Sequence, residues 1–282
     1  MQLKKNDLCD VCSTQLNISG THCDVCYSDI GFPNIRKAES EEVELQERYE
    51  LAHSSIKVQG NEVESENFEN FVDSSFVVMN RSFTDVFNVL QSNRSIVPFH
   101  KQVASSMRSY EQNKYDLNRD AYESKVSPGY YEDIHYGLLA KDEGGSGYYG
   151  DVSIKFGEKF IKNRTSFFQD DTYDFCDKHQ LVVTEDAPKG YRSTWKNRKK
   201  LALIKLHPNI KKGMSDSDMA KLLFDTDTNS YIEAHIYGTI SKESFEKVTI
   251  TSNPIRKGSK GLIFGIIDIL EELKIPYEEV KS

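Results

Sequence analysis

The chain has 282 residues, of which 28% are charged and 38% hydrophobic, and its formal net charge is -8 at pH 7. This length allows one or two domains with a substantial core, and the acidic total argues against a general nucleic-acid coat protein. The longest apolar run, residues 262–267, is too short to span a bilayer. The start of the chain has no apolar stretch of signal-peptide length, so we expect a soluble, cytosolic protein without membrane contact.

Two Cys-x-x-Cys pairs lie near the start of the chain, Cys9 with Cys12 and Cys23 with Cys26. A zinc ion takes four ligands at tetrahedral corners, and two such turns present two thiolates each. The spacing therefore predicts one structural zinc site in a zinc-ribbon-like module over residues 1–35. Four thiolates leave no open position for a water or a substrate, so this zinc is not expected to be catalytic. The alternative, a pair of disulfides, is disfavoured in a reducing compartment.

Residues 36–71 are rich in glutamate. A thin apolar stripe at helical spacing predicts one exposed helix over residues 37–58. The members of this stripe are Val43, Leu45, Ala52 and Ile56. Gly60 ends the helix, and residues 60–70 are expected to form a loop or linker. This acidic arm is either a contact for a basic partner or a solvated spacer between two modules.

Residues 72–282 have the pattern of a globular domain. Short apolar segments, several with the alternation of half-buried antiparallel strands, predict strands over residues 72–79, 134–139, 151–156, 181–183, 201–206, 231–236 and 247–250. Helical spacing predicts helices over residues 82–90 and 262–273, and a polar segment over residues 105–131 is expected to be helical as far as Ser127. The mixture predicts an α+β domain rather than a doubly wound sheet.

No standard nucleotide-binding motif is present in the sequence. The glycine cluster at residues 144–147 lies between two expected strands and is interpreted as a hairpin loop. Two other stretches stand out, residues 133–168 and 230–250. In the second, Tyr231, Glu233 and His235 share one face of the expected strand. A carboxylate in mid-strand between aromatic side chains is poorly placed for an ordinary surface residue.

These stretches resemble the ADP-ribosyltransferase superfamily, in particular its bacterial and phage-linked toxin and defence branches. In that superfamily a split, mainly antiparallel sheet binds NAD in a cleft. The resemblance covers residues 72–255. It matches His135 to the early-strand residue that holds the dinucleotide, residues 164–166 to a middle patch, and Glu233 to the late-strand catalytic glutamate. Tyr231 stands where arginine-modifying members have Gln or Glu, so a protein-arginine target is not expected.

Breaking the bond between nicotinamide and ribose creates an oxocarbenium-like centre, and a carboxylate facing that charge stabilises the transition state. The resemblance implies that Glu233 and His135 are catalytic. The residues that it implies for dinucleotide binding are His135, Gly137, Tyr149, Arg164, Ser166 and Phe168. Structural alternatives are a satisfied sheet histidine for His135, a surface salt bridge for Arg164, and core packing for Tyr149 and Phe168.

A basic stretch from Lys189 to Lys200 contains the single tryptophan, Trp195. Cations interleaved with aromatic side chains suit contact with nucleic acid, but a protein-docking loop or a solvated lead into the next strand fits equally. Two functions stay open. One is an NAD-consuming toxin or defence transferase that modifies a protein or nucleic acid, with an antitoxin or inhibitor as a candidate partner. The other is a non-enzymatic zinc-ribbon module that binds nucleic acid or protein.

Overall fold

The computed structural model describes residues 8–110, 114–147, 149–181, 187–225, 228, 230–252 and 260–281. Its strands are β1 (Phe76–Arg81), β2 (Ile134–Ala140), β3 (Val152–Phe156), β4 (Thr165–Phe168), β5 (Arg192–Thr194), β6 (Glu233–Tyr237), β7 (Phe245–Ser252) and β8 (Tyr277–Lys281). They form one sheet in the order β5-β4-β6-β2-β1-β3-β7-β8. Neighbouring strands are antiparallel except for β7 and β8, which are parallel.

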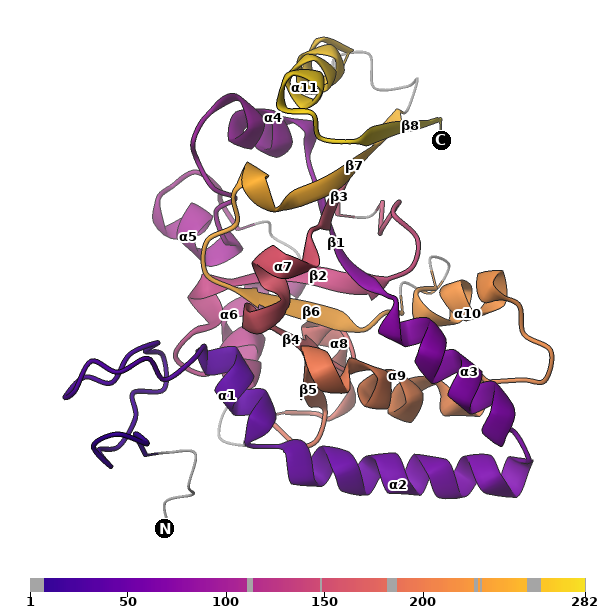
Figure 1. Ribbon diagram of the computed structural model, residues 1–282. Helices are drawn as coiled ribbons and strands as arrows, with labels where there is room; N and C mark the ends of the chain where they lie inside the picture. Colours follow the sequence, from indigo (N-terminus) through magenta and orange to yellow (C-terminus); the bar gives the residue numbers. More distant parts are fainter. Residues whose placement is uncertain are drawn as a thin grey trace.

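Helices surround this sheet (Figure 1). They are α1 (Pro33–Glu39), α2 (Glu42–Gln59), α3 (Glu62–Asp73), α4 (Phe83–Gln91), α5 (Phe99–Ala104), α6 (Lys114–Val126), α7 (Glu158–Ile161), α8 (Thr172–Lys178), α9 (Arg198–Leu206), α10 (Asp216–Leu223) and α11 (Lys260–Leu273). The predicted α+β class with a mainly antiparallel sheet is confirmed. Among the described helices, none combines the length and apolar character needed to cross a membrane.

The two faces of the sheet have different roles, because successive side chains of a strand point to opposite faces. One face contributes Val77, Met79, Leu139 and Ile236 to the main hydrophobic core, which side chains of α2, α3, α4, α9 and α11 complete. The opposite face carries Val78 and Leu138 in a smaller apolar cluster. Polar side chains share that second face, and they form the candidate site.

The acidic segment over residues 36–71 packs onto the body of the protein instead of standing free. Leu45 and Ile56 of α2 and Phe68 of α3 are fully buried in the main core. Gly60 closes α2 in the left-handed conformation, as expected, but the residues after it continue as α3 and not as a loop. The expectation of exposure is wrong for one side of α2, where Leu45, Ala52 and Ile56 meet the core, whereas Val43 of the predicted stripe stays exposed.

Residues 201–206 form part of helix α9 and not the predicted strand. Leu201, Leu203 and Leu206 are all buried, since α9 packs against both α2 and α3. A short apolar run buried on several sides does not reveal its period, so a strand and a helix look alike in sequence. Strands β4, β5 and β8 and helix α10 were not predicted, and of the expected strand 181–183 only residue 181 lies within the described residues, outside any strand.

Asn34 in α1 fastens the start of the chain to the sheet. Its side-chain nitrogen lies 3.0 Å from the carbonyl oxygen of Arg164, 2.9 Å from that of His235 and 3.2 Å from the hydroxyl of Ser166. Asn34→Ala is expected to lower the free energy of unfolding by about 2–3 kcal/mol, since it removes three hydrogen bonds to buried or partly buried acceptors. Denaturant unfolding measures this, with the exposed Asn67→Ala as control; equal effects of the two variants would contradict the prediction.

Candidate functional site

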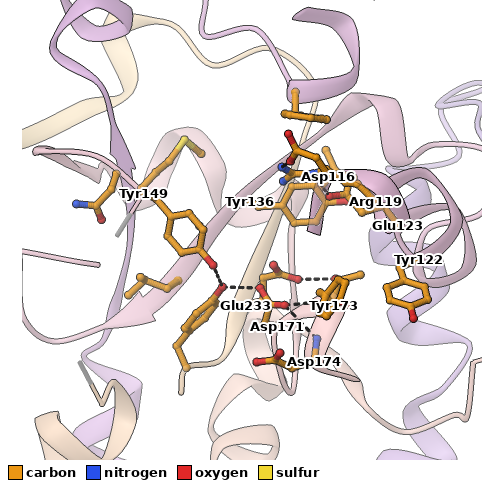
Figure 2. A pocket seen from close by; sticks show the side chains of 18 of the residues that line it. Asp116, Arg119, Tyr122, Glu123, Tyr136, Tyr149, Asp171, Tyr173, Asp174 and Glu233 are labelled. Atoms are coloured by element: carbon orange, nitrogen blue, oxygen red, sulfur yellow. Dashed lines mark hydrogen bonds and ion pairs between the residues drawn. The ribbon is translucent and has the colours of Figure 1, made fainter. Parts of the chain in front are cut away.

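A cavity opens where the two halves of the sheet diverge. Strand β1 pairs with β2 over residues 76–78 and with β3 over residues 78–81. Beyond residue 78 the facing edges of β1 and β2 are therefore not joined to each other. A cavity of about 660 Å³ lies here, lined also by residues of α5, α6 and α8. Its volume is within the usual range of small-molecule sites, and its side chains are drawn in Figure 2.

Glu233 lies in the wall of this cavity, at the start of β6. Its side chain is almost fully buried, with 4% of the residue exposed. One carboxyl oxygen, Oε2, accepts a hydrogen bond from the hydroxyl of Thr172 at 2.6 Å and lies 2.7 Å from Nε2 of His235. Thr172 is the first residue of α8, so the helix start holds the carboxyl group in place.

The electrostatics of this pair favour the neutral forms of both groups. Burial raises the pKa of Glu233 well above its usual value, and the negative charge of Asp171 acts in the same direction. Burial also lowers the pKa of His235 to about 3, with the positive charge of Arg192 as a second cause. The 2.7 Å contact has the geometry of an ion pair, but its surroundings favour a hydrogen bond between neutral groups. A carboxyl group with a strongly raised pKa in a cavity is typical of a functional site.

Three arginines and several carboxylates share the cavity with Glu233. The cations are Arg81, Arg108 and Arg119. Arg119 donates from Nε to Glu123 at 2.5 Å. The second oxygen of Glu123 lies 2.6 Å from Nε2 of His100, whose Nδ1 lies 2.9 Å from Asp120. These contacts fix Arg119 in the wall, so that its guanidinium is preorganised for an anionic ligand.

Tyrosine hydroxyls connect the other side of the cavity (Figure 2). The hydroxyls of Tyr149 and Tyr231 lie 2.9 Å apart, and Tyr231 donates to Asp171 at 2.7 Å. The other oxygen of Asp171 accepts from the backbone N–H groups of Tyr173 and Asp174 and so caps α8. One carboxylate therefore positions both a cavity tyrosine and the helix that carries Thr172.

Of the residues expected from the sequence, the structure brings Glu233, Gly137 and Tyr149 together in the cavity wall. Gly137 has a close-approach role, because a Cβ atom there would lie 2.7 Å from the carbonyl oxygen of Val78. His135 is not among the lining residues. It pairs with Ile236 across the sheet, and that register places its imidazole on the face opposite to Glu233.

Arg164, Ser166 and Phe168 also lie away from the cavity lining. Arg164 donates to the carbonyl oxygens of Phe160 and Tyr237. The hydroxyl of Ser166 is buried under α1, and Phe168 is a core residue packed on Phe175 with ring centroids 4.6 Å apart. The dinucleotide contacts expected of His135, Arg164, Ser166 and Phe168 therefore do not agree with this placement.

His135 has a predictable effect on stability. Burial and, second, the charge of Arg81 lower the pKa of His135 to about 3, although the backbone of Gly238 acts in the opposite direction. The unfolded chain binds a proton at this histidine below its ordinary pKa and the native protein does not, so stability is lost as pH falls from about 6.5 toward 3.

His135→Leu is expected to remove this contribution. The difference in unfolding free energy between the variant and the natural protein should grow by about 1.4 kcal/mol per pH unit between about pH 5.5 and 4. Urea unfolding at several pH values measures the slope, with His53→Leu, in exposed surroundings on α2, as control. A difference that does not change with pH would contradict the prediction.

Several cavity residues were not anticipated from the sequence. They are Arg81, Arg119, Glu123, Asp171 and Thr172. Arg119 and Glu123 stand four residues apart in a helix, a spacing typical of any solvated ion pair. Asp171 and Thr172 have the pattern of a helix cap, and nothing local links them to Glu233 some sixty residues later in the chain. His235 is different, because strand alternation already puts it on the face of Glu233.

The four cysteines form a compact cluster at the start of the chain. The sulfur atoms of Cys9, Cys12, Cys23 and Cys26 all lie within 4.8 Å of one another. Tetrahedral zinc with sulfur at about 2.3 Å separates its ligands by about 3.8 Å, so this set fits the ion. All five cysteines of the chain are free, which excludes the disulfide alternative in this structure.

The basic stretch over residues 189–200 is largely built into the body. Arg192 is 2% exposed and pairs with the buried Glu41 at 3.0 Å. Trp195 is 4% exposed and packs on Phe167, and Arg198 donates to the backbone of Trp195 and Asp73. Because the tryptophan ring is buried, it cannot stack on a base, and the stretch holds α1, α2 and α9 against the sheet.

Known proteins show only a weak structural likeness to this chain and no significant likeness in sequence. No protein-family model matches the chain, and no curated protein matches it significantly. Among solved structures, DarT from Thermus sp. 2.9 in complex with carba-NAD+ is similar with a TM-score of 0.37 and 9% sequence identity, over 72% of this chain and 94% of that one. A likeness of this strength does not assign the chain to a family.

Proposed function

We propose that this protein is an NAD-dependent ADP-ribosyltransferase that uses Glu233 to cleave the bond between nicotinamide and ribose. The observation that carries the proposal is the position of Glu233, a buried carboxyl group in the wall of a cavity of about 660 Å³. The proposal extends to the acceptor, a macromolecule in a toxin or defence setting, in line with the resemblance noted in the sequence.

Charges and aromatic rings in the cavity suit a dinucleotide. Arg81 and Arg119 would pair with the pyrophosphate, in place of the Arg164 expected from the sequence. Nε of Arg81 is buried and has no hydrogen-bond partner among the described residues, so an anionic ligand would satisfy it. Tyr136 and Tyr149 line the same space, and the half-exposed ring of Tyr149 is available to stack on a flat heterocycle.

Glu233 supplies the chemical step in this proposal. As the C–N bond breaks, nicotinamide leaves with the bonding electrons as a neutral molecule, and positive charge develops on the ribose. The ionised carboxylate stabilises that charge more than it stabilises the ground state. The acceptor, or water, forms the new bond to the ribose carbon and loses a proton. Because nicotinamide in NAD is cationic, its arrival favours ionisation of Glu233 despite the raised pKa.

The test is incubation of the purified protein with NAD and measurement of released nicotinamide, with and without cell extract as a source of acceptor. Release by the natural protein, and its loss in Glu233→Gln, would support the proposal. Absence of release together with absence of NAD binding in calorimetry would overturn it and favour a non-enzymatic binding module.

A further inference from the structure

His235 is the polar neighbour that shares one strand face with Glu233. The two residues are separated by one position in β6, and only Oε2 of Glu233 is engaged, by His235 and Thr172. No described residue hydrogen-bonds the other oxygen, Oε1, although the side chain lines the cavity. Because both donors bind Oε2, the other oxygen, Oε1, is left to contact a ligand in the cavity.

The surroundings of His235 suit a neutral imidazole. The residue is 1% exposed. Its ring stacks on Phe168 with centroids 5.7 Å apart and meets the edge of Tyr136 at 5.0 Å. Arg192 is the nearby cation, held in place by Glu41 at 3.0 Å. A neutral imidazole with its proton on Nε2 is a donor to Oε2, while a second positive charge beside Arg192 would be unfavourable.

We propose that His235 is a positioning residue: as a neutral imidazole it donates from Nε2 to Glu233 and, with Thr172, selects Oε1 as the carboxylate oxygen that faces the substrate. The inference rests on the proposed function and deepens it. His235 does not touch the reacting atoms. It acts by fixing the rotamer of Glu233 and by stabilising its ionised form, since hydrogen bonds to a carboxylate favour the charged state.

Other charged and titratable groups also face Glu233 and set its starting pKa. From the neighbouring elements these are Arg119 and Glu123 of α6, Asp171 before α8, Cys176 of α8, Tyr136 of β2 and Tyr231 before β6. Substitutions of His235 or Thr172 leave all of them in place. A change in the pH dependence between variants therefore reports the lost donor.

The first test is the pH dependence of kcat/KM for nicotinamide release, which reports the free enzyme. His235→Phe keeps a ring against Phe168 and removes the donor, and Thr172→Val removes the other donor. Each is expected to move the acid limb upward by about one pH unit, so activity falls about tenfold below the limb and stays within about threefold above it. Thr172→Ser keeps a hydroxyl, so the acid limb of its pH profile should lie at the same pH as in the natural protein. A loss that is uniform with pH in both variants would mean a merely structural role.

The second test needs no activity. NMR of the imidazole nitrogens, with His235 assigned by its loss in His235→Phe, distinguishes the two neutral tautomers and the imidazolium. The expected result is the neutral Nε2–H tautomer between about pH 5 and 8. An Nδ1–H tautomer or an imidazolium would overturn the inference. If the natural protein released no nicotinamide, the proposed function would fail, and this measurement would still decide the state of His235.

Discussion

Replacing Glu233 with glutamine should slow nicotinamide release by about 1,000-fold while weakening the affinity for NAD by no more than about tenfold. Glutamine has the same shape, and its carbonyl oxygen can accept from Thr172 and His235 as Oε2 does. What it lacks is the negative charge that faces the developing positive ribose. The loss should therefore appear mainly in kcat, with a smaller effect on binding because the carboxylate also faces the cationic nicotinamide of NAD.

The thermal stability of Glu233→Gln shows whether its loss of activity is caused by unfolding. Because burial raises the pKa of Glu233, its ionised form destabilises the native state at pH values above the ordinary carboxyl pKa. A neutral glutamine removes that cost, so Glu233→Gln should unfold at the same or a higher temperature than the natural protein at pH 8. Glu66→Gln, an exposed change on α3, is the matched control for activity. Single-turnover release that stays near the natural rate in Glu233→Gln would remove the basis of the proposed chemistry.

Much of the sheet follows from local pattern. The predicted strand at residues 151–156 differs from β3 by one residue at one end, and that at residues 134–139 lacks only the last residue of β2. The closing helix at residues 262–273 is α11 without its first two residues. Alternation over five or more residues, or an apolar helix face, carries enough local information to define these elements. The α+β class needed nothing more.

The site depends on register, which the sequence does not contain. In the pairing of strands β2 and β6, Leu138 is the register partner of Glu233, and His135 is the register partner of Ile236. A shift by one residue would have brought His135 and Glu233 to the same face. The order of residues along the chain matched the resemblance, but the pairing decided which side chains meet. Asp171 and Thr172 enter the site only because α8 begins beside β6, a long-range contact that no local signal announces.

Removing a metal ion from the four cysteines should unfold the first thirty or so residues and leave the rest of the protein folded. Cys9 and Cys23 are the buried nonpolar side chains of this segment among the described residues, while Val11, Val25 and Tyr27 are largely exposed. A segment without an apolar core depends on its metal, which supplies on the order of 10 kcal/mol. Metal analysis should find one zinc ion per chain in the natural protein, and none after chelation or in the Cys23→Ser variant. Cys176→Ala, in the body, should leave it unchanged.

Hydrogen exchange and activity measurements show how far along the chain structure is lost when the metal is removed. On chelation, residues 8–30 should lose protection while α2 and β6 keep theirs, and nicotinamide release should stay within about threefold. Arg36 bonds to backbone carbonyls of the zinc segment, including those of Asn17 and Gly31, but Asn34 bonds to β6. A chain that begins at residue 32 should therefore cleave NAD, whereas one that begins at residue 36 loses Asn34 and should be destabilised. Equal behaviour of the two shortened chains would show that α1 does not support the strand of Glu233.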